Sequence, residues 1–487
     1  MELRLFIALS VLVLAAAIPV IGAAICGATI AVQVALLALR PLGACLSVHP
    51  SPVPRDPATS WFSVHIATHC EPPRMVITTL RALLDQQWPT ASYEIVVMDN
   101  NTANPALWKP VERFCAAHPG RIRFLHRTGV RDAKAGALNI ALAHTDTRAT
   151  HIVTVDADYV VAPDFLGRAV VALRRTGADY VQFPQSYTGT ALVAPGVDAE
   201  LEEYFRTNAA SADDAEAVLL TGTLCVISRA ALVAAGGWSG AATTEDAELG
   251  VRLCNAGFSG RFINQLVGKG LLPLSLCDLE KQRYRWCSGN VQTLMRHAAI
   301  VLGLAGSLTL AKRIAILSQL TAWVNLALVP SLLLMAWLLT GQGHTAPATL
   351  AGVAIVLSLC DIIIRVLARA WRDRLAPGIA LRALACRIAL APQSAKATFD
   401  ALTGCRLKFI VTDKTGIRTP AVSALSPCTL LIFIIGVLLL AIAQPADPIV
   451  FTALTALMLP FPAAVLTGNS LLAYRDAVKA QTQEAMA

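Results

Sequence analysis

Apolar stretches long enough to cross a membrane lie towards both ends of this chain, and none lies in its middle. A membrane-spanning helix needs about 20 apolar residues. The run from Leu5 to Leu39 contains no charged residue, and four further stretches occupy 314–339, 347–366, 421–443 and 449–473. The region from 51 to 298 has no such stretch. The sequence therefore predicts a soluble domain between two membrane-embedded regions.

The N-terminal run is too long for one spanning helix and short for two. We favour a tight hairpin of two spans that breaks near Gly22–Gly27, rather than one long helix. The segment 365–418 is rich in Lys and Arg, whereas the breaks at 341–346 and 444–447 contain neither. By the positive-inside rule, that segment and the central domain lie in the cytoplasm. Mixed polar and apolar segments at 278–299 and 378–402 are typical of helices that lie along a membrane surface.

Composition excludes several classes of protein. The 487 residues are 55% hydrophobic and 15% charged, whereas soluble domains average about 25% charged residues. The net charge of +8 is too small to indicate nucleic-acid binding by itself. The 12 cysteines form no CxxC pair, so we expect reduced thiols rather than disulfides or a zinc site.

From Trp61 onwards, short apolar runs alternate with segments of helical period. We expect strands at 61–67, 93–98, 121–125 and 151–155, with helices at 75–86, 104–117 and 133–143. This βαβ succession predicts a Rossmann-like α/β fold with a mostly parallel sheet. Ligands bind beyond the carboxyl ends of such strands, so the polar residues that follow them should converge on one cleft. Neither GxGxxG nor a P-loop follows any strand, which argues against dinucleotide reduction and P-loop chemistry.

Asp156 and Asp158 come directly after the fourth expected strand. Two residues apart on an extended segment, their carboxylates lie on the same side of the chain, which suits Mg²⁺ or Mn²⁺ carrying a diphosphate. The alternative is a solvated turn without ligand.

Nine short motifs follow one another in a specific order and are closed by membrane spans. They are VHIATHCEPP, MDNNT, KAGALN, VDADYVVAPDFL, FPQSY, TGTLCVISRAAL, TEDAELGVRL, QRYRW and FIVTDK. In this combination the chain resembles processive family 2 glycosyltransferases of the cellulose synthase superfamily. The resemblance implies a cytosolic GT-A domain that uses a nucleotide sugar, and an α-helical membrane channel that extrudes the growing polysaccharide. It divides the chain into a membrane segment at 1–50, a GT-A domain at 51–300 and a channel region at 301–487, with an interfacial helix and a gating loop at 376–418.

The resemblance assigns expected roles to individual residues. Thr68, Glu71, Asp99, Lys134 and Asp156 match positions that bind the UDP-sugar, and Asp156 with Asp158 matches the metal-binding pair. In Thr244-Glu245-Asp246, Asp246 matches the catalytic base, with Glu245 beside it. A carboxylate facing the acceptor hydroxyl would remove its proton during attack on the anomeric carbon. The alternative is that Thr244 merely caps a helix.

Further matches concern the acceptor and the gating loop. In QRYRW, Gln282 and Arg285 match residues that meet the diphosphate or the acceptor, and Trp286 matches the ring that stacks beneath the acceptor sugar. The alternative is a membrane-surface helix with snorkelling arginines, which would account for Arg283. Gly222 and Thr223 match the acceptor end of the site. The gating loop that closes over UDP corresponds to Phe409, Val411, Thr412 and Lys414.

The resemblance leads us to expect an inverting, processive enzyme of the bacterial inner membrane that polymerises glucose from UDP-glucose and translocates the β-glucan. His69, Cys70 and Arg283 depart from the usual pattern and resemble the β-1,3-glucan (curdlan-type) branch more than β-1,4-cellulose synthases. The alternatives are a non-processive enzyme that makes a membrane glycolipid, a synthase of another β-linked polysaccharide, and a transporter or scaffold that has lost catalysis. We expect no PilZ regulatory domain in this chain, and the sequence does not indicate whether an accessory periplasmic subunit binds. Asp361 and Arg365, one helical turn apart, fit an interfacial ion pair or a role in the polymer path.

Overall fold

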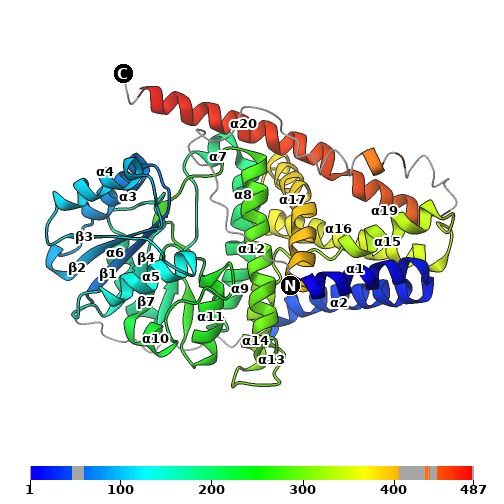
Figure 1. Ribbon diagram of the computed structural model, residues 1–487, viewed down its shortest axis with the longest axis horizontal. Coiled ribbons are helices and arrows are strands. Elements are labelled where there is room, and N and C mark those ends of the chain that lie inside the picture. The colour runs from blue at the N-terminus through cyan, green and yellow to red at the C-terminus, as the bar shows by residue number, and fades with distance from the viewer. Residues whose placement is uncertain (1, 47–59, 405–433, 437, 439–446, 485–487) are drawn as a thin grey trace.

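The computed structural model describes residues 2–46, 60–404, 434–436, 438 and 447–484. Figure 1 shows an α/β body at one end and a bundle of long helices at the other, with helix α12 between them. The expected combination of an α/β domain and apolar helices is confirmed.

A seven-stranded sheet forms the centre of the α/β body. Its order is β3-β2-β1-β4-β7-β6-β8, and only β7 runs antiparallel to its neighbours. The strands are β1 (Phe62–Thr68), β2 (Tyr93–Asn100), β3 (Ile122–Arg127), β4 (His151–Thr154), β6 (Tyr180–Gln182), β7 (Cys225–Ser228) and β8 (Gly260–Phe262). A second sheet pairs β5 (Val160–Val161) with β9 (Gly268–Lys269). Every residue of β2 is buried, as expected for a parallel strand covered on both faces.

Amphipathic helices cover both faces of this sheet. In α3, Val76, Leu80 and Leu83 recur at helical spacing, and all three are buried in the core beneath it. The helices of the body are α3 (Pro73–Leu84), α4 (Pro105–Ala116), α5 (Ala133–Ala143), α6 (Phe165–Thr176), α10 (Arg229–Ala234) and α11 (Glu245–Asn255), with a 3₁₀ turn η1 (Thr90–Ser92). The strands and helices up to β4 fall within a few residues of their expected positions.

Several helices connect the α/β body to the bundle. They are α7 (Thr190–Val193), α8 (Pro195–Glu203), the π-helical turn η2 (Tyr204–Ala209), α9 (Ala210–Asp213), α12 (Leu276–Arg296), α13 (Ala298–Val301) and α17 (Pro377–Thr403). Helix α17 packs along α8 and α12. The expected helices at 278–299 and 378–402 correspond to α12 and α17.

The bundle contains α1 (Glu2–Ala17), α2 (Pro19–Leu46), α15 (Leu328–Leu339), α16 (Ala346–Arg372), α19 (Pro448–Met458) and α20 (Pro460–Glu484). Among the described residues, three segments are long and apolar enough to cross a membrane, at 19–39, 346–372 and 448–478. Two shorter apolar helices, at 3–17 and 328–339, lie beside them. These helices indicate a membrane-associated protein.

The N-terminal run divides into two helices at Ile18, earlier than the expected break near Gly22–Gly27. Proline lacks a backbone N–H and restrains the residue before it, so Pro19 favours the start of a new helix. Gly22 lies inside α2, where a β-carbon would stand 2.4 Å from Trp337. Its lack of a side chain permits close packing against α15.

The expected single span at 314–339 is wrong. The stretch forms α14 (Leu310–Leu320) and α15, separated by a non-helical segment at 321–327. Helix α14 packs into the core of the α/β body, where the buried Gln319 donates to Ala217 O at 2.9 Å and accepts from Leu219 N at 2.8 Å. Hydropathy cannot distinguish a helix buried in protein from one buried in lipid. The expected span at 421–443 lies almost wholly outside the described residues.

Candidate active site

Lys134, at the start of α5, bonds to the segment that follows β4 and to the segment that precedes β7. Its Nζ donates to Asp156 Oδ1 at 2.5 Å and to Gly222 O at 3.0 Å. Burial disfavours its charged form, but the carboxylates of Asp156, Glu245 and Asp246 prevail and raise the pKa of Lys134 above its usual range. This ammonium group therefore stays charged at neutral pH.

The turn that presents Lys134 is strained. Asp132 and Ala133 have φ angles of +63° and +46°, in the left-handed region that disfavours residues with a β-carbon. Backbone strain of this kind concentrates at functional sites, where the surrounding structure holds it.

Asp246 lies in the first turn of α11, facing the same cleft. Burial, together with the neighbouring Glu245 carboxylate, raises the pKa of Asp246 to about 7, against the opposing effect of Lys134. Such a carboxylate can accept a proton at neutral pH. Thr244 precedes the helix, but its side chain makes no capping hydrogen bond, so the structure does not support the interpretation of this motif as a simple cap.

Two glycines allow close packing around the cleft, one beside its charged groups and one beside the start of α11. Gly222 has φ +81°, and a β-carbon there would meet Asp246 Oδ2 at 2.8 Å and Lys134 Nζ at 3.3 Å. Gly289 of α12 lies against the start of α11, where a β-carbon would stand 2.6 Å from Thr244 Oγ1. Beside Gly222, the buried Thr223 accepts a hydrogen bond from Asp156 N at 3.0 Å.

The cleft has an empty volume of about 1070 Å³. The expected residues that line it are Lys134, Asp156, Gly222, Glu245, Asp246, Gln282, Arg285 and Trp286. Gln282, Arg285 and Trp286 come from α12, which faces the strand ends across the cleft. The structure thus brings together charged groups, a polar amide and an indole ring, which suit a phosphate and a sugar ring.

The two aspartates expected to bind metal have different surroundings. The Asp156 side chain is 34% exposed in the cleft, whereas Asp158 is buried and its Oδ2 accepts from Leu271 N at 3.1 Å. Within the described residues, no group of three or more His, Cys, Asp or Glu side chains could hold a metal ion. Mg²⁺ is commonly bound by one or two carboxylates and substrate phosphates, so Asp156 fits a metal that arrives with a diphosphate.

Thr68 and Asp99 form a second group at the same edge of the sheet. Asp99 Oδ2 accepts from Thr68 Oγ1 at 2.8 Å and from Thr102 Oγ1 at 2.9 Å, and Oδ1 lies 2.9 Å from His126 Nδ1. The His126 ring stacks on Trp108 at 4.2 Å. Neither Thr68, Asp99 nor Glu71 lines the cleft around Lys134 and Asp246. Phe409, Val411, Thr412 and Lys414 of the expected gating loop lie outside the described residues.

An aromatic passage leads from the cleft towards the bundle. This smaller cavity shares Tyr187, Asp246 and Trp286 with the cleft and extends to Tyr204 and Trp323. The Trp323 ring lies 4.8 Å from Tyr204 and 5.2 Å from Trp286, measured between ring centroids.

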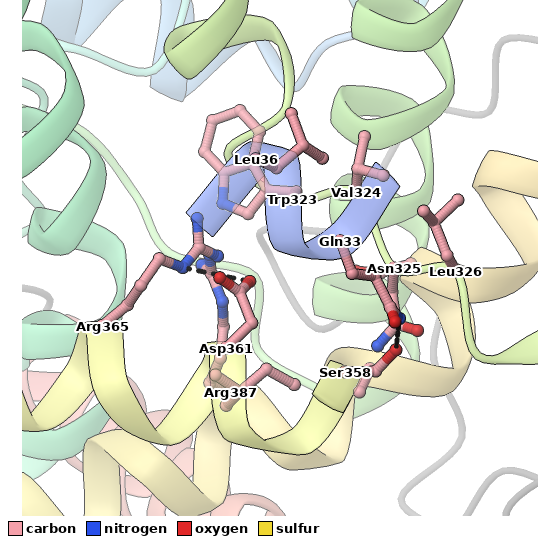
Figure 2. A pocket seen from close by; sticks show the side chains of 13 residues that line it. Gln33, Leu36, Trp323, Val324, Asn325, Leu326, Ser358, Asp361, Arg365 and Arg387 are labelled. Carbon is pink, nitrogen blue, oxygen red and sulfur yellow. Dashed lines mark hydrogen bonds and ion pairs between the residues drawn. The ribbon is translucent and has the colours of Figure 1, made fainter. Parts of the chain in front are cut away.

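Trp323 also borders a polar cavity among α2, α16 and α17, shown in Figure 2. There Gln33 Nε2 donates to Ser358 Oγ at 2.6 Å, while the buried Gln33 Oε1 has no hydrogen-bond partner among the described residues. Asp361 and Arg365 form an ion pair at 3.6 Å and line this cavity, with side chains 18% and 8% exposed. The pair therefore faces the interior of the protein and does not snorkel to a membrane surface.

Sequence reasoning missed Tyr187, Tyr204, Trp323 and His126. Tyr204 and Trp323 follow helices that the sequence does not mark as belonging to a site, and Trp323 lies within a stretch that we expected to cross the membrane. Asn325, a polar residue two positions later, was the available signal that this stretch is interrupted.

Comparisons with known proteins agree with this geometry. Residues 63–234 match the model of "Glycosyl transferase family 2", and residues 151–340 match "Glycosyl transferase family group 2". Over 79% of its length, the chain superposes on all of the mannosyltransferase PcManGT from Pyrobaculum calidifontis, in complex with GDP-Man and Mn²⁺, with a TM-score of 0.54 and 17% identity. The superposition shows a GT-A-like fold, and both matched family models are those of glycosyltransferases.

Two curated relatives give a closer placement. A probable glucomannan 4-beta-mannosyltransferase 15 from Arabidopsis thaliana is 28% identical over 42% of this chain and 39% of its own length. The cellulose synthase 1 catalytic subunit from Komagataeibacter xylinus is 25% identical over 56% of this chain and 36% of its own length. The matches thus span well under half of these relatives. The chain is therefore similar to family 2 glycosyltransferases, among them cellulose synthase catalytic subunits and glucomannan mannosyltransferases.

Proposed function

We propose that this protein is an inverting, processive synthase that polymerises a β-linked glycan from a UDP-sugar, with UDP-glucose favoured. The observation that carries the proposal is the shared cleft of Asp246, Lys134 and Trp286. One carboxylate able to accept a proton lies there with a cation and an aromatic face. A transporter or scaffold without catalysis would need none of this arrangement.

The chemistry follows from these positions. The acceptor hydroxyl attacks the anomeric carbon and gives its proton to Asp246, while UDP departs with the electron pair of the broken C–O bond. Attack opposite to the leaving group inverts an α-linked donor to a β-glycoside. Lys134 and Arg285 favour the negative charge of the departing diphosphate. Asp156 would hold the Mg²⁺ or Mn²⁺ that neutralises this diphosphate.

The remaining expected residues take supporting roles in the proposal. Thr68, Glu71 and Asp99 hold the nucleoside, with His126 orienting the Asp99 carboxylate. Gln282 contacts the donor, while Gly222, Thr223 and Trp286 form the acceptor end. Thr412 and Lys414, which lie outside the described residues, would contact the diphosphate of UDP.

The route of the product is part of the same proposal. The aromatic passage joins the cleft at Trp286 and the polar cavity at Trp323, and the polar cavity lies among α2, α16 and α17. A hydroxyl-rich chain suits these polar and aromatic walls. We place the α/β body in the cytoplasm of a bacterium and the bundle, as a multi-pass unit, in its inner membrane, because 365–418 is rich in Lys and Arg.

The linkage is open to a direct test. The names of the relatives specify cellulose synthesis and glucomannan 4-beta-mannosyl transfer, whereas the resemblance at His69 and Cys70 favours a β-1,3-glucan. Purified protein in lipid vesicles receives radiolabelled UDP-glucose with Mg²⁺ or Mn²⁺, and the product is digested with linkage-specific glucanases. A long product cut by β-1,3-glucanase supports the curdlan-type assignment, and one cut by cellulase overturns it.

The same assay tests the assignment of the base. Asp246→Asn should abolish incorporation while UDP still binds. Asp164→Asn is the matched control, because Asp164 is a partly exposed aspartate whose ion pair with Arg168 lies on α6. Normal incorporation by Asp246→Asn would refute the mechanism.

One observation favours a non-processive glycolipid synthase as the second candidate. Beyond the polar cavity lies an apolar cavity of about 1110 Å³, lined mostly by aliphatic side chains of α15, α16, α17 and α19. A lipid chain suits such walls better than a polysaccharide does. A short product that extracts into organic solvent would establish this alternative.

A further inference from the structure

Three buried charges connect helices of different parts of the molecule. Glu200 belongs to α8, Arg283 to α12 and Arg387 to α17, and their side chains are 0%, 1% and 6% exposed. Glu200 Oε1 accepts from Arg387 at 2.7 Å and from Arg283 at 2.8 Å, and Oε2 accepts from Arg283 at 2.7 Å. Burial disfavours the carboxylate, but the two guanidinium groups prevail and hold the pKa of Glu200 below its usual range.

Arg387 extends this connection to the non-helical segment at 321–327. Arg387 donates to Ala322 O at 2.6 Å, and Arg365 donates to the same oxygen at 2.5 Å. Figure 2 shows both arginines at the edge of the polar cavity, near Asp361 and Trp323. Ala322 directly follows the C-cap of α14, so the two cations also lie beside the end of a helix that carries partial negative charge.

The residue after Ala322 is Trp323, whose ring faces Trp286 across the aromatic passage. The Arg283 guanidinium carbon lies 5.8 Å from the centre of the Trp286 ring and 5.4 Å from that of Trp323. Glu200 is therefore connected to Trp323 in two ways. One runs through Arg283 to the faces of both rings, and the other through Arg387 to the backbone that carries Trp323.

We propose that Glu200 is a positioning residue that sets the separation of Trp286 and Trp323 and so retains the growing product behind the transfer site. The inference rests on the proposed function and deepens it. Without this carboxylate, two buried arginines lose their shared partner, and breaking a buried ion pair is strongly unfavourable. Both arginines would then move towards other acceptors, of which Glu203 already lies 3.5 Å from Arg387.

Such a shift affects product retention rather than donor binding. Lys134 and Asp156 lie on α5 and after β4, outside this set of ion pairs, so the donor should bind normally. A product that is poorly held dissociates early, and water replaces the acceptor hydroxyl in more turnovers. The consequences are shorter chains and more UDP released per sugar incorporated.

The test uses the full chain in lipid vesicles supplied with UDP-glucose. Glu200→Gln should shorten the mean product by about tenfold, since a misplaced substrate costs up to about a hundredfold in rate. It should raise the ratio of UDP released to sugar incorporated and leave the KM for UDP-glucose unchanged. Glu202→Gln is the matched control. It removes another α8 carboxylate, which pairs with Arg369 at 2.8 Å, away from both rings, and should retain wild-type product length.

A second variant keeps the test decisive if Glu200→Gln does not fold. Arg365→Gln leaves Glu200 and its partners in place but removes one donor to Ala322 O, and should shorten the product to a smaller extent. If Glu200→Gln folds and keeps the wild-type product length and the wild-type ratio of UDP released to sugar incorporated, the inference is overturned. If Glu200→Gln does not fold, the same result for a folded Arg365→Gln overturns it. In that case polymer made by the wild type still supports the proposed function, whereas a wild type that makes no polymer overturns both.

Discussion

Replacing Gly222 by alanine would place a methyl group between the two charged side chains that we assign to catalysis. At φ +81° the new β-carbon lies 2.8 Å from Asp246 Oδ2 and 3.3 Å from Lys134 Nζ. The first distance is shorter than van der Waals contact, so the Asp246 carboxylate must move. The left-handed backbone adds about 1–2 kcal/mol of strain.

The backbone strain can be separated from the contact. Gly120 has φ +76° with nothing within 4 Å of a β-carbon, so Gly120→Ala carries the strain alone. We expect both variants to lower the melting temperature, because the left-handed backbone reduces the free energy of unfolding of each by about 1–2 kcal/mol. Only Gly222→Ala should lower kcat, by about 10- to 100-fold, because displacement of a catalytic group by about 1 Å has effects of that size.

The assay is UDP release by purified protein at saturating donor, with melting followed in the same detergent. If Gly222→Ala keeps the kcat of Gly120→Ala, then Asp246 either tolerates the displacement or is not the base. An unchanged kcat would refute the reasoning that the contact at Gly222 holds this carboxylate in its catalytic position.

Three further predictions concern protons, metal and nucleotide. The base must be deprotonated to act, and the pKa of Asp246 is raised to about 7. We therefore expect kcat/KM to rise with pH through about 7 and then to level off. A profile that is flat from pH 5 to 9 would contradict this prediction. Calorimetry should find that Mn²⁺ binds weakly to the protein alone and tightly in the presence of UDP, and Asp156→Asn should remove this difference. Tight binding of Mn²⁺ without UDP would instead show a preformed metal site. His126→Ala should raise the KM for the UDP-sugar several-fold with little change in kcat, because the ring holds Asp99 rather than the reacting atoms; a change confined to kcat would argue against a nucleotide role.

The first half of the α/β body was predictable because its local signals agree with one another. From Phe62 to Thr154, strands of β-branched and aromatic residues alternate with amphipathic helices, and the polar residues fall at the strand ends. Asp156 could be placed in a cleft from its position after β4 alone. The pairing of Lys134 with Asp156 and Gly222 O could not, because it depends on the strained turn before α5 and on a contact between residues far apart in sequence.

The aromatic passage was beyond sequence reasoning for a different reason. Tyr204 and Trp323 have no motif around them, and they meet only because α14 packs on the α/β body. An apolar stretch such as 314–339 carries the same hydropathy whether its surroundings are leucines of the protein or lipid chains. The ion pairs of Arg283 could not be predicted from the sequence either, since an arginine on an amphipathic helix is most often exposed.

The position of α14 determines where the molecule can be divided. A fragment that ends at residue 300, where hydropathy would place the boundary, loses a helix whose Ile316 and Leu320 are fully buried in the core of the α/β body. It also leaves Leu219 N and Ala217 O without the Gln319 side chain that satisfies them. A fragment that extends to residue 320 keeps both. Dissection of this protein for crystallisation or binding studies should therefore treat α14 as the last helix of the α/β body.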